Sequence, residues 1–63
     1  MHEFKVNDMS CNHCVHAITQ AALALDPQAK VDIDLPSKIV RIESSASTEA
    51  FRHAIDEAGY TAE

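Results

Sequence analysis

Two cysteines, Cys11 and Cys14, are the residues of this chain whose type and spacing point most directly to chemistry. They are its only cysteines, and they lie three positions apart in the run MSCNHC at positions 9–14. Such a pair has three common uses. It holds one soft metal ion, it cycles between a dithiol and a disulfide, or it supplies half of a four-ligand zinc site.

The residues after the pair favour a soft metal ion. Apolar residues recur with a helical period from Cys14 onward, so we expect Cys14 in the first turn of a helix and Cys11 in the loop just before it. The positive end of a helix lowers the pKa of a nearby thiol, and the thiolate is the form that binds metal. Two surface sulfurs suit Cu(I), which prefers thiolate ligands. A closed zinc site needs four ligands, and His13 and His16 are poorly placed to complete it, since His16 follows Cys14 by only two helical positions.

A redox role remains the minor alternative, because Cys-x-x-Cys is also the motif of thioredoxin-like proteins. The chain is short for that fold, and Pro27 and Pro36 both fall in predicted turns rather than beside a late strand. A purely structural role for the cysteines is disfavoured, since a surface loop offers no core for them to fill.

Size and charge narrow the class of protein. With 63 residues the chain forms one small domain, spanning 1–63, in which packing takes up most of the apolar side chains. Little remains to line a buried substrate pocket, which argues against an enzyme. The net charge of -5 argues against a nucleic acid partner and favours docking to a protein surface that carries lysine and arginine.

The location expected from the sequence is the cytosol, where thiols stay reduced. The chain opens with no basic head followed by an apolar run, and it has no stretch of the roughly 18–20 apolar residues that cross a bilayer, so no membrane insertion is expected. Because it starts at Met1, we interpret the chain as a free-standing protein, with an excised domain of a larger protein as the open alternative.

The hydrophobic pattern predicts the order strand, helix, strand, strand, helix and a short last strand. This is the order of the ferredoxin-like βαββαβ fold, an α+β sandwich with both helices on one face of an antiparallel sheet. The strands are expected over 2–7, 30–35, 38–43 and 60–63, with one helix from Cys14 to Asp26-Pro27 and one between the N-cap Ser47 and the left-handed cap Gly59. The first helix is expected to carry one apolar stripe, formed by Val15, Ile18, Ala22 and Leu25. The predicted core comprises Phe4, Ile18, Leu23, Val31, Ile33, Val40, Ile42, Phe51 and Ile55.

The motif and the order of elements resemble the heavy-metal-associated (HMA) domain, and are most similar to the small bacterial copper chaperones of the CopZ type. The run MSCNHCV between the first strand and the first helix carries the resemblance, together with Ala58-Gly59-Tyr60 after the second helix. It covers essentially the whole chain. Glycine often precedes the motif methionine in this family, whereas this chain has Asp8. Zinc-transporting relatives commonly carry aspartate before the first cysteine, so Ser10 favours copper.

The resemblance implies that Cys11 and Cys14 hold one Cu(I), or Ag(I), and that the protein carries metal without catalysis. It implies transfer by stepwise thiolate exchange to the N-terminal domain of a copper-transporting P-type ATPase. A copper buffer or store, delivery to a copper-responsive repressor, and a copper-bridged homodimer remain open alternatives.

Three further residues are expected near the metal. Met9 is expected to fill the core beneath the loop rather than to bind metal. His13 is expected on the surface, and the sharper hypothesis is that it modulates copper or favours copper-bridged dimers. Tyr60 is expected to seal the end of the second helix by packing, and the resemblance places it near the metal loop, where it would shield the thiolates. The remaining histidines are expected on the surface: His2, His16 and His53.

Overall fold

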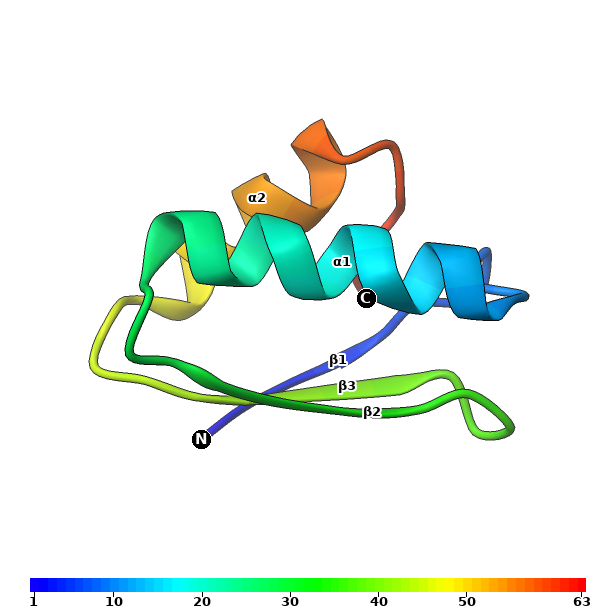
Figure 1. Ribbon diagram of the computed structural model, residues 1–63, viewed down its shortest axis with the longest axis horizontal. Helices are drawn as coiled ribbons and strands as arrows, with labels where there is room; N and C mark the ends of the chain where they lie inside the picture. The colour runs from blue at the N-terminus through cyan, green and yellow to red at the C-terminus, as the bar shows by residue number, and fades with distance from the viewer.

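The computed structural model describes residues 1–63 and shows two layers (Figure 1). Two helices lie over the same face of a three-stranded antiparallel sheet, in which β3 is the middle strand, as the predicted ferredoxin-like arrangement requires. Neither helix is long and apolar enough to cross a bilayer. The elements are β1 (His2–Lys5), α1 (Asn12–Leu25), β2 (Lys30–Asp34), β3 (Ile39–Glu43) and α2 (Thr48–Glu57).

The register of the sheet sorts the strand residues onto two faces. Val40 of β3 lies opposite Phe4 of β1 on one side and Ile33 of β2 on the other. Side chains alternate between faces along a strand, so these three point toward the helices. The neighbouring pair in the register, Glu3 and Arg41, points to the outer face of the sheet, where the two side chains form an ion pair at 2.9 Å. The strand residues that the sequence pattern predicted to face the core therefore do face the helices.

The predicted fourth strand over 60–63 is not formed as a strand. The segment touches β1 at one point, where Lys5 and Glu63 donate backbone hydrogen bonds to each other, at 3.1 and 2.8 Å. The side chain of Asn7 also donates to the Glu63 carboxylate at 2.7 Å. A mutual pair of this kind is one unit of an antiparallel ladder, and a single unit is too short for a strand. Its effect is to hold the C-terminal segment against β1.

Helix α1 begins two residues earlier than predicted. Cys11 is its N-cap, with extended backbone at φ -153°, and Asn12 is its first helical residue. The start was missed because Asn12 and His13 are both polar and contribute nothing to the apolar period. The helix ends at Leu25, as the following Asp26-Pro27 predicts.

Helix α2 has the predicted caps at both ends. Ser47 is its N-cap. At the other end Gly59 has φ 97°, a conformation that glycine adopts without strain. The N–H of Gly59 donates to the Asp56 carbonyl at 2.9 Å, and that of Tyr60 to the Ile55 carbonyl at 3.2 Å. These are the two hydrogen bonds of a Schellman motif, and they set where the chain carries Tyr60.

The core lies between the helices and the sheet, and one predicted core residue, Leu23, and one residue of the predicted stripe, Leu25, lie outside it. Leu23 is 36% exposed and Leu25 is 42% exposed. Leu23 follows the buried Ala22 by one position, a rotation of about 100° around the helix. Leu25 is the last residue of α1, after the buried stripe has ended. The fully buried residues are Phe4, Val6, Met9, Ile18, Ala22, Val40, Ile42, Phe51 and Ile55.

His2 is not a plain surface residue, contrary to the expectation. Its ring is half-buried and lies 5.4 Å from the Phe51 ring, centroid to centroid. Its Nε2 bonds the Ala46 carbonyl at 2.7 Å, and its Nδ1 bonds the Thr48 hydroxyl at 2.6 Å. The ring therefore ties the start of β1 to the start of α2. His16 and His53 are exposed, as expected.

Candidate metal centre

The loop between β1 and α1 brings the two cysteines together at one end of the molecule (Figure 1). Cys11 is exposed at the N-cap of α1, and Cys14 is half-buried in the first helical turn, as predicted. Both are free thiols, and their Sγ atoms are 3.4 Å apart. The two sulfurs are close enough for a sulfur hydrogen bond. At this separation both of them can also contact one small ion.

The surroundings of Cys14 make its thiol unusually acidic. Its pKa is lowered from 9.0 to about 6, first by hydrogen bonding from the Tyr60 hydroxyl, then by a backbone hydrogen bond at Ser10 and by the Cys11 thiol. The thiolate is therefore the major form at neutral pH. Sequence reasoning assigned this effect to the positive end of the helix, whereas in the structure the largest cause is a residue 46 positions away.

Tyr60 lies beside Cys14 because the Schellman motif turns the chain back toward the loop. Its side chain is half-buried and packs against the core. The same interaction raises the pKa of Tyr60, as expected for a hydroxyl that keeps its proton in order to donate it. The Tyr60 hydroxyl is therefore a donor beside the Cys14 thiolate.

Met9 and His13 lie on opposite sides of the site. Met9 is completely buried in the core under the loop, and its N–H donates to the Val6 carbonyl at 3.1 Å. His13 is exposed on the first turn of α1, next to Cys14 in sequence. The structure thus groups Cys11, Cys14 and Tyr60, while Met9 supports the loop from below and His13 faces solvent.

Two residues that hold the loop have no signal in the hydrophobic pattern. The ammonium of Lys38 donates to the Met9 carbonyl at 2.8 Å. The carboxylate of Asp8 accepts a hydrogen bond from the Thr61 N–H, at 3.2 and 3.3 Å from its two oxygens. Asp8 stood out in the sequence only as a departure from the glycine of the family. Its contact joins the loop before Cys11 to the segment that carries Tyr60.

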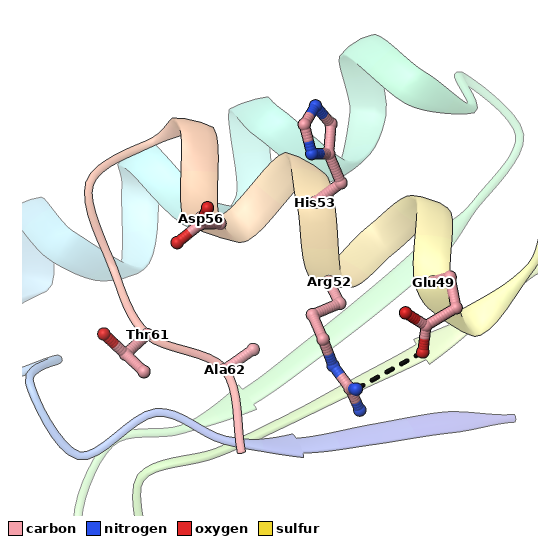
Figure 2. Close-up of a pocket in the computed structure, with 6 residues that line it drawn as sticks. All are labelled: Glu49, Arg52, His53, Asp56, Thr61 and Ala62. Atoms are coloured by element: carbon pink, nitrogen blue, oxygen red, sulfur yellow. Dashed lines mark hydrogen bonds and ion pairs between the residues drawn. The ribbon is translucent and has the colours of Figure 1, made fainter.

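A separate hollow of about 290 Å³ lies between α2 and the C-terminal segment (Figure 2). In Figure 2, Arg52 and Glu49 extend from α2 toward β1 and pair at 3.3 Å, while His53 points away. The hollow contains neither cysteine, and no group of three or more His, Cys, Asp or Glu side chains in the chain could hold a metal ion. It is lined by Glu49, Arg52, His53, Asp56, Thr61 and Ala62.

Comparison with known proteins places this fold and this site in one family. The heavy-metal-associated domain matches residues 3–61, nearly the whole chain. The chain therefore belongs to the heavy-metal-associated domain family, as the motif and the order of elements indicated.

Several of the proteins similar to this chain are copper chaperones. It is 38% identical to the copper chaperone CopZ of Enterococcus hirae over an alignment of 64 positions, which covers 97% of this chain and 93% of that protein. The copper chaperone for superoxide dismutase of Arabidopsis thaliana is 35% identical over 57 residues, and the chain spans only 18% of its length. A tyrosine-for-histidine mutant of the copper chaperone Atx1 from Synechocystis, in a trimeric Cu1 form, has a TM-score of 0.97 and 40% identity, with both chains covered completely.

Proposed function

We propose that this protein is a copper(I) chaperone that holds one ion between Cys11 and Cys14 and passes it to a partner protein. The observation that carries the proposal is the pair of free thiols, 3.4 Å apart at the start of α1. Cys14 is largely thiolate at neutral pH, since its pKa is about 6. The copper chaperones among its relatives, including CopZ of Enterococcus hirae, support the same role.

Copper(I) suits this site better than zinc. Two thiolates form a complete ligand set for a soft ion of low coordination number, whereas structural zinc takes four ligands. Silver(I) shares the preference for sulfur, and we include it as a second ion that the site would accept.

Transfer would proceed by exchange of thiolates on the copper ion. A thiolate of the partner adds to copper, and one of the chain's own thiolates then leaves. Cys14 is suited to leave the ion because the Tyr60 hydroxyl stabilises its free anion. Cys11, exposed at the N-cap, then remains the last contact until a second partner thiolate displaces it. No step oxidises or reduces a group, and no catalysis is needed.

The partner we propose is the N-terminal domain of a copper-transporting P-type ATPase, in the cytosol. The net charge of -5 would steer the protein toward a surface that carries lysine and arginine. A reducing compartment keeps both thiols free for metal.

A copper buffer that forms copper-bridged dimers is the second candidate, supported by the trimeric Cu1 form of the Synechocystis relative. The exposed cysteine and His13 lie where a second copy could reach the ion. Native mass spectrometry at increasing copper-to-protein ratios separates the two roles. A chaperone stays monomeric with one copper up to equivalence, whereas a buffer assembles.

The test of the proposal is an anaerobic Cu(I) titration against a competing chelator, read by mass spectrometry. We expect one copper per reduced chain, and we expect Cys11→Ser and Cys14→Ser each to abolish tight binding because one thiolate cannot hold the ion alone. Ser45→Ala, an exposed change outside the site, is the matched control. Zinc held in preference to copper, or tight binding that survives either cysteine change, would contradict the proposal.

Transfer itself needs a second measurement. The copper-loaded protein is mixed with an isolated ATPase domain, and the copper content of each is measured after separation. We expect copper on both proteins at equilibrium. Rapid reduction of insulin by the dithiol form would instead support the oxidoreductase alternative.

A further inference from the structure

Lys38 has a backbone conformation that lysine seldom adopts. It lies at the end of the turn between β2 and β3 with φ 62°, in the left-handed region. Side chains with a Cβ atom are strained there, and glycine is the residue that the region favours. Strain of this kind persists where the surrounding structure requires it, often near functional sites. The strained backbone of Lys38 therefore indicates that its side chain has a structural role.

That side chain reaches the metal loop, 29 residues earlier in the chain. Its ammonium donates to the Met9 carbonyl at 2.8 Å, while its own backbone carbonyl accepts the Val6 N–H at 2.9 Å. Met9 precedes Cys11 by two positions. Lys38 thus holds the loop at two points, where it leaves β1 and just before the first cysteine. In Figure 1 the β2–β3 turn and this loop lie at the same end of the molecule.

The bond that Lys38 makes is of a strong type. It joins a charged donor to a backbone carbonyl, and the lysine is half-buried, so water competes with it less than at an open surface. The Asp8 carboxylate ties the other side of the loop to Thr61. Two contacts with side chains of opposite charge therefore hold the loop at Asp8 and Met9.

We propose that Lys38 is a positioning residue for the metal site, which fixes the loop so that Cys11 lies beside Cys14 before copper arrives. This inference rests on the proposed copper function. A loop that is already ordered does not lose its conformational freedom when the ion binds, so affinity is higher than for a mobile loop. Loss of the ammonium should weaken Cu(I) binding about tenfold, the scale typical of residues that orient metal ligands.

Three substitutions at position 38 separate positioning from folding. Lys38→Met removes the ammonium and keeps most of the aliphatic chain. Lys38→Gly also removes it but relieves the strain at φ 62°, so its thermal stability should equal or exceed that of the wild type. Lys38→Arg keeps a charged donor. We expect about tenfold weaker Cu(I) binding for the Met and Gly variants and recovery of most of the affinity for Arg. Lys30→Met, at the exposed far end of β2, is the matched control for charge and should bind as the wild type does.

A measurement without metal tests the positioning directly. In the reduced, metal-free protein, amide hydrogen exchange at Met9, whose N–H donates to the Val6 carbonyl, should be faster in Lys38→Met and unchanged in Lys30→Met. Wild-type affinity in both Lys38→Met and Lys38→Gly, or unchanged exchange at the Met9 amide, would overturn the inference. If the wild type itself does not bind Cu(I), the proposed function fails, and the exchange measurement still decides whether Lys38 holds the loop.

Discussion

Cys14 and Tyr60 form one titrating unit, in which a thiolate and a phenol lie side by side. The pKa of the thiol is lowered to about 6 and that of the phenol is raised, because the phenol donates to the anion. The unfolded-state pKa of the thiol is the higher one. In the reduced, metal-free protein, the Cys14 thiolate therefore stabilises the fold fully above pH 9.0, and this contribution is lost as pH falls through 6.

Replacing Tyr60 should raise the pKa of Cys14. In a Cys11→Ser background, which leaves one thiol, the ultraviolet absorbance of the thiolate should titrate with a midpoint below pH 9.0, because Tyr60 and the Ser10 backbone still lower the pKa of Cys14. Tyr60→Phe keeps the ring and removes the donor, so its midpoint should move upward. His16→Phe, at an exposed position of α1, is the control and should leave the midpoint in place. Identical midpoints with and without the Tyr60 hydroxyl would show that this hydroxyl does not lower the pKa of Cys14.

At the scale of elements, the residues of the candidate site come from the ends of the helices rather than from their middles. The start of α1 carries both cysteines, and the end of α2 turns Tyr60 toward them. The turn between β2 and β3 supplies Lys38. The candidate metal centre therefore lies where three connections between elements meet.

The N-cap of α2 should contribute measurably to stability. The Ser47 hydroxyl accepts the Ala50 N–H at 3.1 Å, and loss of such a cap costs about 1 kcal/mol. Chemical denaturation of Ser47→Ala should show this loss in the free energy of unfolding. The exposed Ser45 is not the cap, so Ser45→Ala should leave that free energy nearly unchanged. Equal effects of the two substitutions would show that the cap does not stabilise α2.

At the scale of the whole molecule, the metal loop is supported by a very small core. Nine residues are fully buried, and Met9 of the loop is one of them. A domain of this size is expected to be stable by about 3–9 kcal/mol, at roughly 0.05–0.15 kcal/mol per residue. Each core side chain therefore contributes a large share of the free energy of unfolding.

Met9 should prove replaceable by another large apolar residue. Met9→Leu conserves volume and should cost less than about 1.5 kcal/mol, whereas Met9→Ala should cost about 2–5 kcal/mol by leaving a cavity. Copper affinity should be unchanged in Met9→Leu, because the thioether is fully buried in the core. Thermal denaturation and the competitive Cu(I) titration measure the two properties separately. A large drop in copper affinity for a well-folded Met9→Leu protein would mean that the thioether is a ligand.

The sequence by itself determined the local features of this protein. Alternation of apolar residues located the three strands, and the signals at Ser47, Gly59 and Asp26-Pro27 located helix ends, because these depend on the conformation of near neighbours. The spacing of Cys11 and Cys14 indicated a site for a soft metal. Local patterns were not sufficient at Leu23, which was predicted to lie in the core and is 36% exposed in the structure.

Only the tertiary structure decided how the site is held. Lys38 reaches Met9 across 29 residues, and the N–H of Thr61 meets Asp8 across 53. His2 packs on Phe51, and Tyr60 lowers the pKa of Cys14. Such contacts follow from the way the helices and turns pack over the sheet, and no period in the sequence encodes which polar side chain will reach which distant backbone group.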